Sequence, residues 1–275
     1  MPTPLLRDVV AVLDELYDPS WADDWDAVGT VAGDPQAEVG RVLLAVDPVS
    51  AVVDEAIAWG ADLIVTHHPL WLKGVTSVAA TSPKGRVVHS LITHGIALHA
   101  CHTNADSPRL GVSESMAYAL GLFDVRPLEP DTDDEQPDRG SGRIGVLQSP
   151  TTLVAFSEHV ARSLPSHRSA VRVAGDPGRP VRTVALCGGS GDFLLGAAQA
   201  QGADVYVTSD LRHHPVSEHL EQPDPCAVID VPHWSAEWTW LPVAASALAE
   251  RLPEVEVKVS TIVTDPWTAI VPGTV

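Results

Sequence analysis

The chain has 275 residues, a hydrophobic content of 45% and a formal net charge of −19, which describe a globular protein with a large buried core. That negative charge repels nucleic-acid phosphates and anionic lipids, so the composition argues against a polynucleotide or a membrane surface as partner. No apolar run reaches the roughly 18 residues that a membrane-spanning helix requires.

The N-terminus and the cysteines indicate a cytoplasmic protein. The first twenty residues, "MPTPLLRDVVAVLDELYDPS", predict an amphipathic helix and lack the basic start and cleavage pattern of a secretory signal. Cys101, Cys187 and Cys226 are odd in number and widely spaced, which argues against a disulfide framework or a cysteine zinc site. We expect each of them to be a small buried residue.

Short apolar runs alternate with helical patterns along the first half of the chain. Strands are predicted at 42–46, 62–66 and 95–101. A helix is predicted at 50–59, where Ser50 begins the pattern and Gly60 follows its end. Such alternation is typical of an α/β protein with largely parallel strands.

The stretch "PLEPDTDDEQPDRGSG" (127–142) is rich in proline, acids and glycine, so we expect a linker there. Beyond it, strands are predicted at 143–147, 170–174, 181–187 and 204–208, and helices at 152–164 and 193–201. The expected domains are therefore an α/β half at 1–126 and a second at 143–275. We predict mixed, largely parallel sheets in three layers.

The two predicted halves resemble each other in sequence. Residues 42–66 align without a gap on residues 184–208, with nine of the 25 positions identical, including Gly-Ala-Asp before the second strand. Any two strand–helix–strand units resemble each other loosely, so chance is an alternative. A second match, "HTNAD" (102–106) with "HWSAE" (233–237), argues against chance and predicts two related halves.

Polar side chains that suit metal ions follow the predicted strands. They are His67, His68, His102, Asp106, Asp210, His213, His214, His233 and Glu237. Ligands of open parallel sheets bind outside the carboxyl ends of the strands, so these residues can gather at one site between the halves. Imidazole and carboxylate donors without thiolate suit Zn, Fe, Mn, Ni or Co.

The adjacent pair His67–His68 indicates two ions rather than one. Neighbouring side chains point in divergent directions, so each is better placed to serve one ion of a pair about 3.5–4 Å apart. The alternative is that both are strand-end histidines with ordinary hydrogen bonds. That alternative requires the repeated His-x-x-Ala-acid motifs to be coincidental.

Five motifs together resemble a known family. They are "VTHHPLWLKG" (65–74), "HTNAD", "CGGSG" (187–191), "TSDLRHH" (208–214) and "HWSAE". They resemble the GTP cyclohydrolase I type 2 homologues, also called Nif-three-like dinuclear-metal-centre proteins. The resemblance runs from residues 25–35 to residues 264–267, nearly the whole chain.

The resemblance implies two divalent ions held by His67, His68, Asp106, His233 and Glu237. The family pattern assigns His67 and Asp106 to one ion and His68 and His233 to the other, with Glu237 bridging them. It also implies a ring-shaped homohexamer built from trimers, with the metal sites facing an internal cavity. Four further residues match family positions near the metals: His102, Thr103, Asn104 and His214. There they would support the ligands, bind substrate or move protons.

The chain also departs from the family pattern. Pro232 stands where the family usually has glycine, and Trp234 stands where the family often has tyrosine. The proposed ligands are retained, so these differences affect the pocket and the substrate. Four tryptophans lie near the proposed ligands in the sequence: Trp71, Trp234, Trp238 and Trp240. We predict that they either stack on a flat substrate or pack in the core or at a subunit interface.

The loop "CGGSGD" (187–192) is a candidate phosphate site, because the backbone amides of Gly189 and Ser190 could hold a substrate phosphate. A plain tight turn is the alternative. The loop fails the dinucleotide and P-loop patterns, and Asp192 breaks the Gly-x-Ser-x-Gly pattern of serine hydrolases.

The sequence therefore predicts a metal-dependent hydrolase. Two ions would lower the pKa of a shared water toward ~7, with Glu237 bridging and His102 or His214 moving a proton. The family label points to opening of the purine ring of GTP; a nucleotide or another phosphoester would use the same ions. A hexameric metal carrier or regulator without catalysis is the alternative from another class, and a metal-free structural protein is the third.

Overall fold

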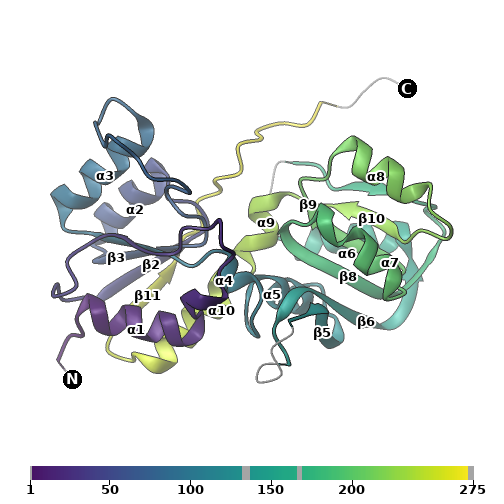
Figure 1. Cartoon of the computed structure of the whole chain (residues 1–275), viewed down its shortest axis with the longest axis horizontal. Coiled ribbons are helices and arrows are strands. Elements are labelled where there is room, and N and C mark those ends of the chain that lie inside the picture. The colour runs from purple at the N-terminus through teal and green to yellow at the C-terminus, as the bar shows by residue number, and fades with distance from the viewer. Residues whose placement is uncertain (1, 132–136, 166–168, 272–275) are drawn as a thin grey trace. The chain divides into compact units, whose positions relative to one another are not determined.

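The computed structural model describes residues 2–131, 137–165 and 169–271, which form two compact units (Figure 1). Unit 1 contains the chain up to Ala105 together with Leu241–Thr264. Unit 2 contains Asp106–Trp240 and the segment that begins at Asp265. Each unit has its own sheet, and each is described by itself.

This division differs from the one expected at residues 127–142. Strand β5 (Phe123–Pro130) and strand β6 (Gly140–Thr152) are antiparallel neighbours in one sheet. The proline- and acid-rich stretch therefore connects two strands of unit 2 instead of two domains. Residues 132–136 of that stretch lie outside the described residues.

Unit 1 is built on a five-stranded sheet in the order β1-β4-β3-β2-β11. The four strands β4, β3, β2 and β11 are parallel, and β1 pairs antiparallel with β4 at the edge. The bounds are β1 Gly29–Ala32, β2 Arg41–Ala45, β3 Leu63–Thr66, β4 Ala97–Ala100 and β11 Glu256–Val259.

Helices cover both faces of the sheet in unit 1. Figure 1 shows α2 and α3 on one face and α1 and α10 on the other. Leu43, Ile64 and Leu98 pack in one buried cluster with side chains of α2 and α3. The helices of this unit, with the linking α4, are α1 Leu6–Leu16, the 3₁₀ turn η1 Pro19–Trp21, α2 Ser50–Trp59, α3 Pro83–His94, α4 Thr103–Asp106 and α10 Trp240–Arg251.

Unit 2 is built on a six-stranded sheet in the order β5-β6-β8-β9-β10-β7. Its strands β8, β9 and β10 are parallel, and the other pairings are antiparallel. The remaining bounds are β7 Arg172–Ala174, β8 Pro180–Ser190, β9 Val205–Ser209 and β10 Ala227–Asp230. The predicted α/β class with mixed sheets is confirmed.

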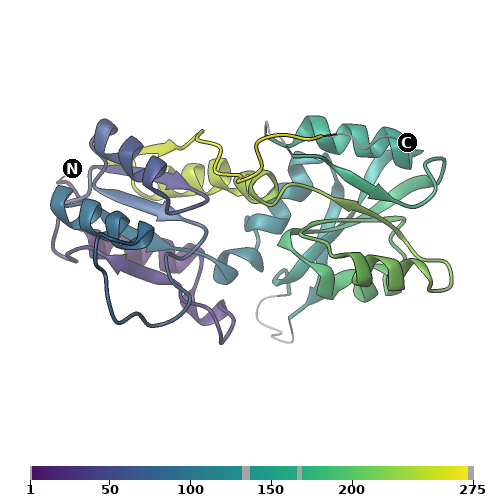
Figure 2. The same ribbon diagram turned by 90° about the horizontal axis from the view of Figure 1, so that it is seen from above.

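Unit 2 also has three layers, because its strands alternate between two buried clusters. Val184 and Leu186 of β8 pack with α5 and α6, whereas Ala185 and Cys187 pack with α7. Figure 2 shows α6 (teal) above the sheet and α7 and α8 (green) below it. The helices are α5 Val112–Ala119, α6 Leu153–Ser163, the 3₁₀ turn η2 Asp192–Leu194, α7 Leu195–Ala200, α8 His213–Leu220 and α9 His233–Trp238.

The repeat seen in the sequence corresponds to two structurally equivalent strand–helix–strand segments, β2–α2–β3 in unit 1 and β8–α7–β9 in unit 2. Val42 pairs with Leu63 in unit 1, and Val184 pairs with Val205 in unit 2, so the parallel register is the same in both. In both units a left-handed glycine follows the helix, at φ 74° for Gly60 and 71° for Gly202.

The aspartate of the repeated Gly-Ala-Asp motif fixes that register. Asp62 Oδ2 accepts hydrogen bonds from the amides of Gly40 and Arg41, at the start of β2. Asp204 Oδ2 accepts from Arg182 and Thr183, near the start of β8. Each carboxylate therefore anchors the beginning of its neighbouring strand, which is a physical reason for the identity of this motif in both halves.

Within the residues that the structure describes, no helix is long and apolar enough to cross a membrane. Cys101, Cys187 and Cys226 are buried and free of disulfides, as the sequence predicts.

The buried His99 of β4 predicts a loss of stability in acid. Its side chain is 2% exposed and its Nδ1 lies 3.1 Å from the hydroxyl of Thr30 in β1. Burial lowers the pKa of His99 to about 4, below the value of about 6.5 expected in the unfolded chain. Between these values the unfolded state binds a proton that the folded state does not bind, so the free energy of unfolding falls as the pH falls.

We expect a loss of about 2 to 3 kcal/mol between pH 7 and pH 4.5 that the variant His99→Gln does not show. Urea unfolding of both proteins at the two pH values measures it. Equal pH dependence in the two proteins would contradict the assignment of this loss to His99.

Candidate metal centre

Three imidazoles gather at the carboxyl ends of two neighbouring strands in unit 1. His67 and His68 directly follow β3, and His102 follows β4. Because Thr66 and Ala100 pair at the ends of these parallel strands, the residues after them share one edge of the sheet. The ring centroids lie 5.1 to 5.6 Å apart, and one ring nitrogen from each residue lies within 4.8 Å of the others.

Protein oxygens hold the Nδ1 atoms of His67 and His68. His67 Nδ1 lies 3.0 Å from the carbonyl oxygen of Cys101, and His68 Nδ1 lies 2.7 Å from Oδ1 of Asp47. A carbonyl or carboxylate oxygen can only accept, so the proton of a neutral ring resides on Nδ1 and Nε2 presents the lone pair. Histidines that bind metal ions show this arrangement in general.

His102 is held in the same way by Asp26. Its Nδ1 lies 2.8 Å from Oδ1 of Asp26, whose carboxylate is fully buried. Sequence reasoning did not find Asp26 or Asp47 as functional residues. Asp47 comes two residues after β2, so the strand-end rule that selected the histidines could have found it. Asp26 lies outside any strand end and carries no such signal.

A second group of candidate ligands lies in unit 2. Helix α9 starts with His233, and Glu237 lies one turn later on the same face, with His233 Nε2 2.6 Å from Glu237 Oε1. His233 Nδ1 lies 2.7 Å from Oδ2 of Asp210, which follows β9. Asp210 has φ 56°, in the left-handed region, which aspartate tolerates better than most residues with a side chain.

The charge around His233 favours a cation. Burial alone lowers the pKa of His233, but the carboxylates of Glu237 and Asp210 raise it to about 11. This position in unit 2 therefore stabilises positive charge strongly, as a site for a divalent ion must.

Asp106, at the end of α4, and Glu237 both influence the thiol of Cys187 in unit 2. Burial raises the pKa of the Cys187 thiol to about 12, and the negative charges of Asp106 and Glu237 contribute to this rise. The thiol stays protonated at neutral pH, so Cys187 is not a thiolate ligand. The donors that remain are imidazoles and carboxylates, which fit first-row divalent ions.

Gly189 makes room for Glu237 and His233 at the end of β8. It has φ 76°, and a Cβ atom built on it would lie 2.7 Å from Glu237 Oε1 and 3.7 Å from His233 Cε1. The glycine is buried, whereas Ser190 is exposed. A role for either residue in phosphate binding stays a prediction; the close approach of Glu237 is a second reason for glycine that the sequence did not indicate.

Thr103 and Asn104 make contacts that support His102. The Thr103 amide and hydroxyl both donate to Asp26 Oδ2, and Asn104 Nδ2 donates to the backbone oxygen of Tyr17 at 2.6 Å. These bonds tie the chain after β4 to the segment between α1 and β1. Substrate binding by Thr103 and Asn104 is not tested by these contacts.

His214 is exposed on α8 beside His213, with ring centroids 5.2 Å apart. Within the described ranges, neither residue belongs to a group of three or more side chains able to share an ion. A proton-transfer role for His214 therefore stays a prediction. Trp234 is 6% exposed and Trp71 packs against the core of unit 1, which favours packing over stacking on a substrate.

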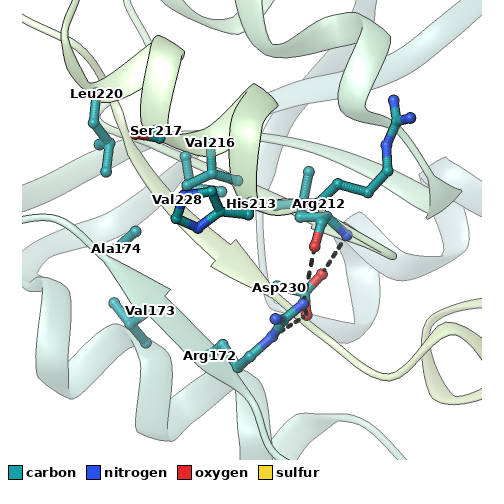
Figure 3. Close-up of a pocket in the computed structure, with 11 residues that line it drawn as sticks. Arg172, Val173, Ala174, Arg212, His213, Val216, Ser217, Leu220, Val228 and Asp230 are labelled. Atoms are coloured by element: carbon teal, nitrogen blue, oxygen red, sulfur yellow. Dashed lines mark hydrogen bonds and ion pairs between the residues drawn. The ribbon is translucent and has the colours of Figure 1, made fainter.

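A pocket of about 360 Å³ lies between β7, β10 and α8 in unit 2 (Figure 3). Val173, Val216 and Val228 give it an apolar lining, and at one end Arg172 Nε donates to Asp230 Oδ2 at 2.8 Å. His213 lines it, but none of the five predicted metal ligands does. The sequence did not indicate this pocket, because its lining comes from three elements that are separated in the chain, β7, α8 and β10.

Comparisons with known proteins agree over nearly the whole chain. The sequence model of the family described as Duf34/NIF3 (NGG1p interacting factor 3) matches residues 4–266. A Streptomyces coelicolor protein named "GTP cyclohydrolase 1 type 2 homolog" is 51% identical over 270 residues, covering 97% of this chain and 94% of that protein. A Drosophila melanogaster "NIF3-like protein 1" is 33% identical over 223 residues, covering 78% of this chain and 72% of its own.

Solved structures show the same fold. A Bacillus cereus protein related to NIF3 matches with a TM-score of 0.91 and 24% identity, covering 98% of this chain and 100% of that one. A Staphylococcus aureus hypothetical protein, SA1388, matches with a TM-score of 0.90 and 29% identity at the same coverage.

The space around Gly189 gives a testable prediction. Gly189→Ala places a methyl group 2.7 Å from Glu237 Oε1 at a left-handed backbone position. We expect the free energy of unfolding to fall by about 1 to 3 kcal/mol, because both the contact and the conformation are strained. Displacement of Glu237 should also weaken binding of divalent ions, measured by isothermal titration calorimetry.

Gly196→Ala is the matched control, since Gly196 lies in α7 with open space around its Cβ position. It should be neutral or slightly stabilising. A Gly189→Ala protein as stable as this control, with unchanged metal affinity, would show that the close approach of Glu237 is unimportant.

Proposed function

Because the chain belongs to the Duf34/NIF3 family, we propose that it is a dinuclear metal protein and a metal-dependent hydrolase. The predicted ligands are His67, His68, Asp106, His233 and Glu237. The observation that carries the proposal is the hydrogen bonding of the imidazoles. In each of the three ligand histidines Nδ1 faces a protein oxygen, so Nε2 is the nitrogen that would bind an ion. For His233 an ion would replace the proton that Glu237 and Asp210 stabilise on the ring.

The charges of both units support two divalent ions per chain. Asp106 and Glu237 contribute two negative charges as proposed ligands. Two more come from Asp47 and Asp210, whose carboxylates contact Nδ1 of His68 and of His233. Carboxylates that orient imidazoles raise their basicity and their affinity for metal ions. The donors accept Zn, Fe, Mn, Ni or Co, and they do not distinguish among these ions.

The proposed hydrolytic role requires a side chain that accepts the proton of the attacking water. Divalent ions held by these ligands would supply Lewis acidity, which would make a water molecule more acidic and polarise the substrate. His102 lies beside His67 and His68 with its Nδ1 on Asp26, so its Nε2 can accept the proton of a nucleophilic water. His214 is a second candidate for proton transfer.

A nucleotide is the proposed substrate class. The name of the Streptomyces coelicolor relative, "GTP cyclohydrolase 1 type 2 homolog", makes GTP the first compound to test. The amides of Gly189 and Ser190, next to Glu237, are the proposed contacts for a phosphate group. A phosphoester other than a nucleotide would use the same residues.

The proposed assembly is a toroidal homohexamer built from trimers in the cytoplasm. Trp267 and Val271 are large apolar residues with 71% and 89% of their surface exposed, which supports a contact with another copy of the chain. Three free cysteines support a reducing compartment.

Native mass spectrometry of protein purified without a metal-affinity tag tests the ions and the assembly together. We expect six chains with two divalent ions each, and His68→Ala should lose metal because Nε2 of His68 is removed. His94→Ala is the control, since His94 is an exposed histidine on α3. A metal-free wild-type protein under metal-replete conditions would overturn the proposal.

Turnover separates the hydrolase from a metal carrier or regulator. The metal-loaded protein should hydrolyse GTP or a member of a phosphoester panel, and chelation should abolish the reaction. His102→Gln should keep its metal but lose about 10²–10⁴-fold in kcat, because only the proton acceptor is removed. Bound metal without turnover of any compound would reject the hydrolase and favour the carrier.

A further inference from the structure

Asp26 connects the segment before β1 to the residues that follow β4. Its Oδ1 lies 2.8 Å from His102 Nδ1. Its Oδ2 accepts from the backbone amide of Thr103 at 3.0 Å and from the Thr103 hydroxyl at 2.6 Å. The two oxygens are thus divided, one for the imidazole and one for Thr103.

The surroundings hold Asp26 in place. The Thr103 hydroxyl accepts a hydrogen bond from the amide of Asp23 at 2.9 Å, so the chain at 23–26 is fastened at both ends. Trp25 meets the His102 ring edge-on, with centroids 5.8 Å apart and planes at 82°. The Asp26 carboxylate is fully buried, and the His102 side chain is 15% exposed.

Asp26 is ionised at neutral pH. Burial by itself raises the pKa of its carboxyl group, but the hydrogen bonds from His102 and Thr103 hold that pKa well below its usual range. An ionised carboxylate only accepts, so the donors must be the Thr103 amide, the Thr103 hydroxyl and the His102 Nδ1–H. The neutral His102 ring then carries its lone pair on Nε2.

We propose that Asp26 is a positioning residue that fixes His102 in the Nδ1–H tautomer and so makes Nε2 the proton acceptor beside His67 and His68. The catalytic consequence rests on the proposed function, because His102 transfers protons only if the protein is a hydrolase. The tautomer itself does not depend on any reaction.

The step that Asp26 supports is a balanced hydrolysis. The oxygen of a water molecule bonds to the electrophilic phosphorus or carbon of the substrate while one O–H bond breaks and its proton moves to His102 Nε2. The bond to the leaving group then breaks, and the leaving group takes that proton from Nε2. Asp26 keeps its charge throughout and stabilises the imidazolium formed between these events.

Asp26→Asn changes the tautomer for a geometric reason. The Thr103 amide and hydroxyl are donors, so the amide oxygen of the new side chain must occupy the Oδ2 position. Its NH₂ group then faces His102 Nδ1 and donates to it, which forces the proton of the ring to Nε2. The ring keeps a hydrogen bond and its position, yet it loses the lone pair at Nε2.

Neutron diffraction from crystals of zinc-loaded protein reads this tautomer directly. We expect deuterium on His102 Nδ1 in the wild type and on Nε2 in Asp26→Asn. Asp24→Asn is the control, because it removes the same charge from an exposed residue two positions away. Deuterium on Nε2 of His102 in the wild-type protein would overturn the proposal even if no variant folded, and so would an unchanged tautomer in Asp26→Asn.

Kinetics then separates the two proposals. With a substrate found, Asp26→Asn should lower kcat by about 10²–10⁴-fold with little change in KM, as the wrong tautomer does in enzymes with an Asp–His pair. Asp24→Asn should retain full activity. A tautomer that changes as expected in a protein without turnover supports the positioning role and rejects the hydrolase, whereas normal kcat in Asp26→Asn rejects the positioning role.

Discussion

The site depends on parallel strands that end at one edge of a sheet. In unit 1 this register places His67 and His68 after β3 next to His102 after β4, although 34 residues separate the two ends. The same rule gathers residues after β8, β9 and β10 in unit 2. Side chains far apart in the sequence thereby meet without any loop having to fold over the sheet.

Both units use the same device to orient an imidazole. Asp47 follows β2 and holds His68, which follows the neighbouring strand β3. Asp210 follows β9 and holds His233, which comes after the neighbouring strand β10. When the gapless alignment of 42–66 with 184–208 is continued by two residues, His68 corresponds to Asp210. The same strand-end position therefore provides a predicted ligand in unit 1 and, in unit 2, the carboxylate that contacts Nδ1 of a predicted ligand.

Local patterns were sufficient to predict the central strands, the helix Ser50–Trp59 and the repeated unit, because each depends on alternation and caps within a short stretch. The division into units could not be predicted in this way. It depends on β11 returning to pair with β2, a contact across more than 200 residues that no composition signal reveals. A stretch rich in proline and glycine marks a turn as readily as a linker, and at 127–142 it joins β5 to β6. Sequence patterns also missed the role of Asp26 and the need for glycine at position 189. Both depend on contacts with residues distant in the sequence, His102 for Asp26 and Glu237 for Gly189.

We propose that imidazole Nε2 atoms and two carboxylates of this chain bind a pair of divalent ions. Anomalous diffraction from crystals grown with Mn²⁺ or Zn²⁺ tests it most directly. We expect two strong anomalous peaks per chain, contacted by Nε2 of His67, His68 and His233 and by carboxylate oxygens of Asp106 and Glu237. No peak at these residues, or contacts made through Nδ1, would contradict it.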